Sequence, residues 1–185
     1  QKTVLISQYV TRGLDPDVEM KDSRSKYIGN IPKGWKISRL GYESDVIDPQ
    51  PDHRAPEIDE NGYPYIGIRD IDENGEVNIS TCRLVKLAAI EKQEKSYDIN
   101  NDDLIFCKVG TLGFSRFFKK PSNRFALSAT LVIIKINKEN DPRFINFALQ
   151  SEYINNIINF ESTGSTRKAL GIQTIRNFKI ALPPL

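Results

Sequence analysis

Residues 104–138 read LIFCKVGTLGFSRFFKKPSNRFALSATLVIIKINK, and this stretch decides the fold. Its two apolar runs, Leu104–Val109 and Ala126–Ile136, are rich in the β-branched and aromatic side chains that suit a pleated surface. The window contains seven Lys or Arg residues and no Asp or Glu. We therefore expect two strands that present a long, positively charged loop to an anion, although a solvated hairpin would have the same composition.

The net charge of +2 conceals an uneven distribution along the chain. Residues 1–103 contain 14 basic and 20 acidic side chains (net −6), and residues 104–185 contain 12 basic and 4 acidic side chains (net +8). Phenylalanines at 114, 117, 118 and 125 lie between the cations of the second part, a composition typical of nucleic-acid-binding surfaces. We expect a cationic C-terminal face, with the acidic N-terminal part confining the attraction to one side.

Length and composition restrict the class of protein. With 185 residues the chain can form one ordinary domain with a proper core, and no apolar window is long enough to span a bilayer. Cys82 and Cys107 are expected to be reduced and buried in a cytosolic protein rather than joined in a disulfide. Together with His53 they are too few for a structural zinc site. The chain begins without Met, and we expect it to be a piece of a longer polypeptide.

The other elements are predicted from periodicity and turn residues. Residues 1–14 have the pattern of the end of a helix capped by Gly13, and residues 15–34 that of an extended connector. Strands are predicted at 35–47, 63–71, 77–79 and 178–182, and helices at 84–96, from Pro142, from Tyr153 and briefly at 172–177. Because the order shows no βαβ rhythm, the fold class is α+β: a curved, mainly antiparallel sheet with a few packed helices and an N-terminal helix fragment.

A catalytic constellation is not apparent in the sequence. It contains no nucleophile elbow, Walker motif or dinucleotide-binding glycine motif, and the carboxylates at 70–76 lack the order of a calcium loop. Asp52 with Lys95 faintly resembles a metal-dependent nuclease pattern, which we keep as an alternative. Gly110 and Gly113 would let backbone N–H groups approach a phosphate, or they are simply hairpin glycines.

Five segments together resemble one known family. They are Val10–Pro16 (VTRGLDP) with Met20–Ser23 (MKDS), Tyr27–Trp35 (YIGNIPKGW) followed by Leu40, Lys108–Gly113 (KVGTLG), Gly164–Lys168 (GSTRK) and Ile180–Leu185 (IALPPL). In this order, and over essentially the whole chain, they resemble the specificity (S) subunit of type I restriction–modification enzymes.

This resemblance implies a division of labour. Such subunits carry two target-recognition domains separated by spacer helices, and each domain reads one half of a split double-stranded DNA site. Residues 1–14 would be the end of a spacer helix, 15–34 a linker and 35–185 a target-recognition domain. The family has no catalysis and no cofactor of its own. Its partners, the methyltransferase (modification) subunits and the restriction/translocase subunit, use S-adenosylmethionine, ATP and magnesium in the prokaryotic cytoplasm, away from any membrane.

We predict DNA contacts from side chains that can neutralise phosphates or reach base edges. They are Arg69, Lys108, Thr111, Arg116, Lys119, Lys120, Arg124, Ser165, Thr166, Arg167 and Lys168. Two other classes of function stay open at this point. One is the small nuclease, and the other is a pure protein-interaction module in which the 1–14 helix docks a partner and the basic residues are incidental.

Overall fold

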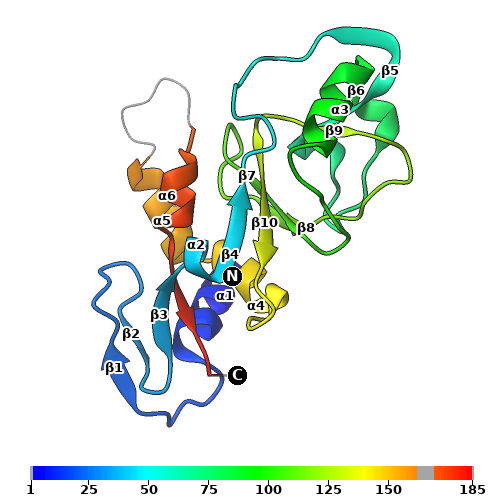
Figure 1. Cartoon of the computed structure of the whole chain (residues 1–185). Coiled ribbons are helices and arrows are strands. Elements are labelled where there is room, and N and C mark those ends of the chain that lie inside the picture. Colours follow the sequence, from blue (N-terminus) through cyan, green and yellow to red (C-terminus); the bar gives the residue numbers. More distant parts are fainter. Residues whose placement is uncertain (1, 162–168, 185) are drawn as a thin grey trace.

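The computed structural model describes residues 2–161 and 169–184, and a four-stranded antiparallel sheet lies at its centre (Figure 1). The strand order across this sheet is β4 (Ser44–Ile47), β10 (Leu131–Ile136), β7 (Leu104–Cys107) and β8 (Ser115–Phe117). Leu131 lies opposite Cys107, and Ile133 lies opposite Ile47. The chain therefore leaves β4 and β7, and enters β10, at one common end of the sheet.

Both faces of this sheet are buried. Four consecutive residues of β10, Leu131–Ile134, are inaccessible to solvent, although successive side chains of a strand point to opposite faces. Val132 and Ile134 belong to a first hydrophobic cluster, and Leu131 and Ile133 belong to a second one. The uninterrupted apolar run of β10 thus reflects burial on two sides.

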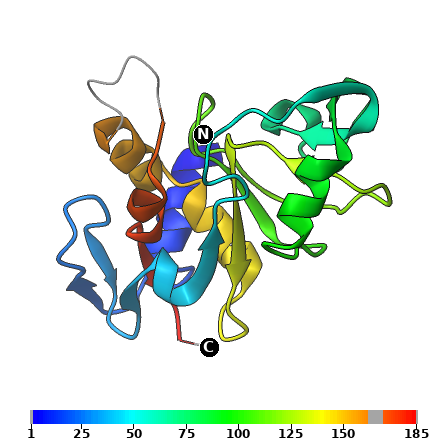
Figure 2. The same cartoon turned by 45° about the horizontal axis from the view of Figure 1, so that its top comes forward.

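Helices cover the face that carries the first cluster. The helical elements are α1 (Lys2–Arg12), α2 (Leu40–Glu43), α3 (Leu87–Glu94), α4 (Pro142–Leu149), α5 (Glu152–Glu161) and α6 (Ile172–Arg176), with two 3₁₀ turns, η1 (Ile68–Asp70) and η2 (Ile79–Thr81). The buried hydrophobic residues of α1, α4, α5 and α6 all belong to the first cluster. Figure 2 shows these four helices on one side of the sheet and α3 on the other.

Three smaller sheets complete the fold. The strands of the first are β6 (Arg83–Val85), β5 (Ile58–Ile66) and β9 (Ala126–Leu127), those of the second are β1 (Met20–Asp22) and β2 (Asn30–Pro32), and those of the third are β3 (Lys36–Arg39) and β11 (Lys179–Leu182). All strand pairs are antiparallel except β5 with β9, which is parallel. The predicted fold class, α+β with a mainly antiparallel sheet and a few helices, is confirmed.

Several local predictions hold and others are wrong. The helix that ends at Gly13, the pairing of the two central strands and the last strand are all present. The single strand predicted over 35–47 is instead interrupted by α2, which sends β3 and β4 into different sheets. The helix predicted from residue 84 begins only at Leu87, because residues 83–85 pair with β5. The run 126–136 is likewise divided, by a turn at 128–130.

Residues 15–34 are extended, as predicted, but they fold back as the β1–β2 hairpin. Ile28 and Ile31 of this segment are buried in the first cluster. The segment therefore contributes to the core, since apolar side chains that reach a buried cluster are stabilised by leaving water. Its role as an interdomain linker stays a prediction.

Gly75 should be intolerant of a side chain. It has φ of +84°, and a Cβ at this position would lie 2.0 Å from the carbonyl oxygen of Phe117. We expect Gly75→Ala to lower the free energy of unfolding by more than the roughly 1–2 kcal/mol of a left-handed residue, because the turn must move away from β8. Urea unfolding measures this. Gly29→Ala is the matched control, since Gly29 has φ of +71° and open space around its Cβ position; equal losses in the two variants would contradict the steric argument.

Candidate nucleic-acid interface

A hollow of about 840 Å³ lies at the end of the central sheet where β4 and β7 end and β10 begins. Residues from five segments of the chain line it, namely 53 and 55, 65 and 67–70, 81 and 83, 109–111, and 128–130. Its polar side chains include Tyr65, Arg69, Arg83, Thr111, Ser128 and Thr130. Two of the predicted DNA contacts, Arg69 and Thr111, are thus brought together.

Tyr65 organises the floor of this hollow. Its hydroxyl donates to Oε1 of Gln50 at 2.6 Å and accepts from the backbone N–H of Ala129 at 3.1 Å. The N–H of Ser128 donates to a carbonyl of β5 at 2.8 Å, and the hydroxyl oxygens of Ser128 and Thr130 are 3.0 Å apart. These bonds join the loop after β4, the strand β5 and the 128–130 turn into one hydrogen-bonded unit.

Arg69 extends from η1 at the side of the hollow. Its neighbour Asp70 is occupied within the turn, because its carboxylate accepts from the N–H of Gly67 at 2.8 Å and from the hydroxyl of Thr81 at 2.8 Å. Arg69 itself is exposed, and its guanidinium has no hydrogen bond or ion pair among residues 2–161 and 169–184. This cation is therefore available to a ligand.

Arg83 lies directly opposite Tyr65 across the β5–β6 pair, and both residues line the hollow. It too is exposed and forms no side-chain hydrogen bond or ion pair within the described part of the chain. Arg83 is not among the predicted contacts, because β6 has only three residues, too few to show a strand periodicity before the helical pattern begins. Ser128 and Thr130 were missed because 126–136 has the composition of one continuous strand.

Gly110 and Thr111 form the lip of the hollow after β7. Gly110 has φ of +87° and open space around its Cβ position, so backbone conformation favours glycine here. Val109 pairs with Ala169, which brings the start of the 169–184 segment beside this lip. Four predicted contacts lie outside the described residues: Ser165, Thr166, Arg167 and Lys168.

Lys108 does not reach the surface. It is only 3% exposed, and its ammonium is paired with the carboxylate of Asp48 from the end of β4. An ammonium enclosed in this way is not presented to a phosphate, so the structure argues against Lys108 as a DNA contact. Arg116 is similarly engaged, because its guanidinium lies 3.5 Å from the ring centroid of Phe114 and donates to the carbonyl of Ile71.

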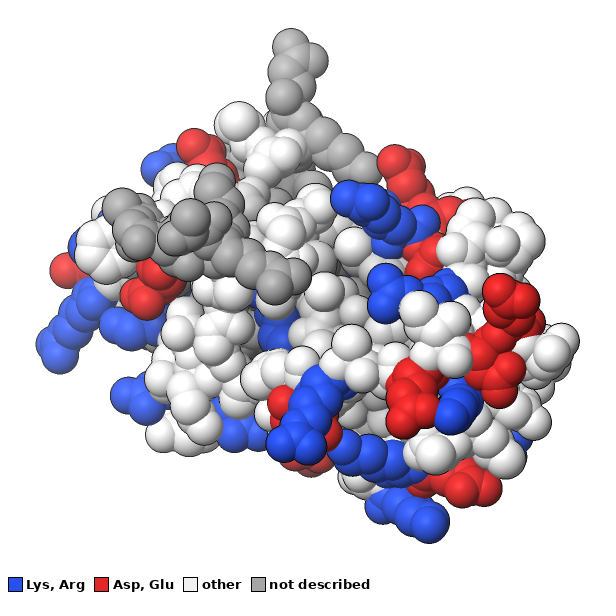
Figure 3. Space-filling model, turned by 90° about the horizontal axis from the view of Figure 1, so that it is seen from above, with Lys and Arg blue, Asp and Glu red and all other residues white. Residues whose placement is uncertain are grey.

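The remaining predicted cations are paired with acidic residues of the N-terminal part and lie outside the lining of the hollow. The pairs are Lys119–Glu76 (2.8 Å), Lys120–Asp98 (3.6 Å) and Arg124–Glu94 (2.6 Å). Figure 3 shows positive and negative groups next to one another on the face seen from above. These ion pairs argue against the expectation of a separate cationic face, because opposite charges far apart in the sequence attract when the fold brings them together.

The two thiols are free, as predicted, although only Cys107 is fully buried and Cys82 is partly exposed; neither is suited to nucleophilic chemistry. Burial and the nearby Asp70 raise the pKa of Cys82 to about 11, and burial raises the pKa of Cys107. Since the thiolate is the reactive form, both side chains are protonated and weakly nucleophilic at neutral pH.

The residues of the alternative nuclease site are not arranged as predicted. Asp52 pairs with Lys92 at 2.5 Å, and within residues 2–161 and 169–184 it forms no ion pair or hydrogen bond with Lys95. Over residues 2–161 and 169–184, no three His, Cys, Asp or Glu side chains cluster so as to hold a metal ion. The helices of this part of the chain also include none with the length and apolar composition needed to cross a membrane.

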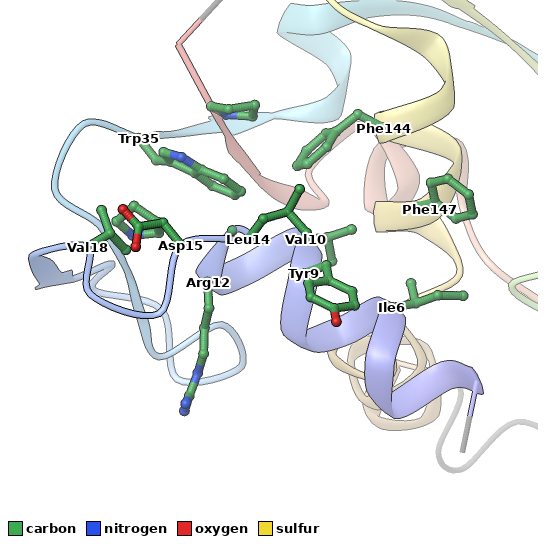
Figure 4. A pocket seen from close by; sticks show the side chains of 13 residues that line it. Ile6, Tyr9, Val10, Arg12, Leu14, Asp15, Val18, Trp35, Phe144 and Phe147 are labelled. Carbon is green, nitrogen blue, oxygen red and sulfur yellow. The ribbon is translucent and has the colours of Figure 1, made fainter.

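A second concavity, the apolar groove, has a volume of about 690 Å³ and lies beside α1 and α4 (Figure 4). Trp35 and Phe144 form part of its wall, with their rings in an edge-to-face contact and their centroids 5.7 Å apart. Leu14 and Phe147 line the groove and are 82% and 48% exposed. Aromatic and aliphatic surface of this kind is typical of protein-binding sites.

Comparison with known proteins identifies the family. The model of the type I restriction modification DNA specificity domain matches residues 32–185. The chain belongs to this family. Its specificity-domain fold also resembles a chain from a study of the complex assembly and conformational transition of a type I R-M system, with a TM-score of 0.59 and 18% identity over 98% of this chain and 40% of that one.

A second solved structure, the HsdS subunit from Thermoanaerobacter tengcongensis, is similar with a TM-score of 0.53 and 15% identity. The match covers 97% of the specificity domain described here and 38% of the HsdS chain. At these identities the likeness concerns the fold, and the present chain spans about two fifths of the length of each neighbour. No curated protein sequence matches closely enough to indicate a relationship.

The Lys108–Asp48 pair should be energetically coupled. Lys108→Met leaves the largely buried carboxylate of Asp48 without its partner, and we expect a loss of about 3 kcal/mol in the free energy of unfolding. The double variant Lys108→Met/Asp48→Asn should lose less than the sum of the single variants, as measured by urea unfolding.

The exposed pair Lys120–Asp98 is the control for this cycle, since its loss should cost less than about 1 kcal/mol. Strictly additive effects of the Lys108 and Asp48 substitutions would contradict the coupling.

Proposed function

We propose that this chain is a DNA-reading domain of a type I specificity subunit and that double-stranded DNA binds across the hollow. One observation carries the proposal: five segments of the chain bring together several hydroxyls, a glycine-containing lip and two guanidinium groups that have no side-chain partner within residues 2–161 and 169–184. Membership of the DNA specificity domain family supports DNA as the class of ligand.

The hollow offers both kinds of contact that sequence-specific binding requires. The hydroxyls of Thr111, Ser128 and Thr130 can donate to phosphate oxygens, which positions a duplex without reading its sequence. Arg69 and Arg83 add positive charge and thereby release counterions from the DNA. Lys119, Lys120 and Arg124 can contribute further, because exposed ion pairs are weak enough to exchange a carboxylate for a phosphate.

Within a complete enzyme the chain would read one half of a bipartite target and would itself catalyse nothing. Methylation and cleavage would belong to modification and restriction/translocase subunits, which would supply the sites for S-adenosylmethionine, ATP and magnesium in the prokaryotic cytoplasm. The rival nuclease assignment has no geometric support among the described residues, because Asp52 is paired with Lys92.

Residues 1–14 would form the end of a spacer helix in such a specificity subunit.

DNA binding by the hollow should be salt-dependent and sequence-dependent. We expect the affinity of the chain for a duplex to fall roughly fortyfold between about 50 and 200 mM salt if about three phosphates are neutralised. Fluorescence anisotropy with labelled duplexes at several salt concentrations measures this dependence. Adding magnesium and plasmid DNA to the same preparation tests the nuclease alternative, and cutting without salt-dependent duplex binding would refute the proposed function.

We also infer a second role, protein docking, from the apolar groove. In Figure 1 α1 and α4 lie well below β5 and β9, so a partner seated on the groove would leave the hollow accessible to DNA. The occupant we propose is a modification subunit, because a reading domain without catalysis must hold a methyltransferase near its DNA. The exposed ring of Phe147 is the side chain of α4 best placed for such a contact.

Phe147→Glu should weaken association with the modification subunit by at least tenfold, because it places a charge on an apolar contact surface. Co-purification and analytical ultracentrifugation of the two proteins measure this effect. Phe160→Glu is the matched control, since Phe160 is also exposed and lies outside the groove lining. Equal association of both variants and the unaltered chain would argue against docking at this groove.

A further inference from the structure

We propose that Arg69 and Arg83 are the base-reading residues of the hollow and that each selects a G·C base pair. This inference rests on the proposed function and deepens it, because it names the bases that the domain recognises.

Arg69 and Arg83 are available to a ligand, whereas most basic residues of the 104–138 stretch are engaged within the chain. Five basic residues of the 104–138 stretch form ion pairs with N-terminal carboxylates, and Arg116 is engaged by a backbone carbonyl and an aromatic ring. Arg69 and Arg83 differ from these, because both are exposed and neither has a side-chain partner within residues 2–161 and 169–184. Two exposed guanidinium groups that have no partner in the described part of the chain, and that line one hollow together, point to an external acceptor.

Hydrogen bonds fix the backbone segments that carry Arg83 and Arg69. Arg83 belongs to β6 and lies opposite Tyr65, whose hydroxyl is bonded to both Gln50 and Ala129. Arg69 belongs to η1, and the carboxylate of Asp70 closes that turn through the N–H of Gly67. The backbone segments of both arginines are therefore held by hydrogen bonds, while their guanidinium groups have no partner within residues 2–161 and 169–184. Precise readout of a base edge requires a side chain that extends from a well-fixed backbone and whose donor groups remain available to the base.

The type of cationic side chain indicates which group of the DNA would be bound. Guanidinium presents parallel N–H donors that match O6 and N7 of guanine in the major groove, whereas the ammonium of lysine acts as a point charge. Among the described residues that line the hollow, the cationic side chains are Arg69 and Arg83, and lysine is absent. Phosphate contacts can be made by the hydroxyls beside them. Because both cationic positions of the hollow hold arginine and neither holds lysine, guanine is favoured as the acceptor.

The test is selection of duplexes from a randomised pool by the chain, alone and bound to its modification subunits. The unaltered chain should select a motif that contains G·C pairs at fixed positions. Arg69→Ala and Arg83→Ala should each abolish the preference at one of these positions, by roughly 5- to 150-fold, and leave the others intact. Arg83→Lys should keep the salt dependence of binding without restoring the preference.

A chemical control separates base reading from phosphate binding. Replacing the selected guanine with 7-deazaguanine, which lacks the N7 acceptor, should weaken binding of the unaltered chain and leave Arg83→Ala or Arg69→Ala unaffected at the matching position. Arg24→Ala is the matched protein control, because Arg24 is also exposed, lies in the β1–β2 loop and is outside the hollow. It should leave the motif unchanged.

Three results would overturn the inference in distinguishable ways. An unchanged motif in both alanine variants would refute base reading by these residues while leaving the proposed function intact. A uniform loss of affinity over all sequences, with a salt slope smaller by about one, would make them phosphate contacts only. A lack of any selected motif with the unaltered chain would refute the proposed function itself. Thermal unfolding should be the same for all variants, since neither arginine has a side-chain partner to lose among the described residues.

Discussion

Consecutive side chains of β10 must all find apolar neighbours, because they face opposite sides of a sheet that is covered on both. Val132 and Ile134 enter the cluster formed with the helices, and Leu131 and Ile133 enter the cluster formed with the strands around β5. A register shift of one residue would exchange the two sets, so the pairing of Leu131 with Cys107 is strongly specified. The rest of the architecture is built on this two-sided burial.

The same constraint creates the hollow. Because β10 runs antiparallel to both β4 and β7, the ends of those strands and the start of β10 meet at one end of the sheet. The loops that follow them lie beside the end of β5, and the hydroxyl of Tyr65 joins two of these segments. A rigid sheet thus carries a surface of loops and turns, an arrangement in which the recognition surface can change while the core stays the same.

Electrostatics in this molecule is decided by pairing across the sequence. A stretch with seven cations and no anion becomes locally neutral where Glu76, Glu94, Asp98 and Asp103 approach it. The buried pair of Lys108 with Asp48 represents the extreme of this tendency, since neither charge could be enclosed alone without a large desolvation cost. Net charge along a chain is consequently a poor guide to the surface, and the two arginines that line the hollow, Arg69 and Arg83, form no ion pair in the part of the chain that the structure describes.

The sequence by itself determined the fold class, the central strand pair, the helices after Pro142 and the family, because hydrophobic periodicity and short motifs are local properties that a linear reading preserves. It did not reveal the short strand β6, the break of 35–47 by α2 or the burial of Lys108. Those features depend on which segments meet in space, as do the carboxylates that neutralise the basic stretch. Of the predicted contacts, Arg69 and Thr111 line the hollow. Arg83 lies beside them because β6 pairs with β5. The tertiary structure decided the site, because a binding surface assembled from five segments has no signature in any one of them.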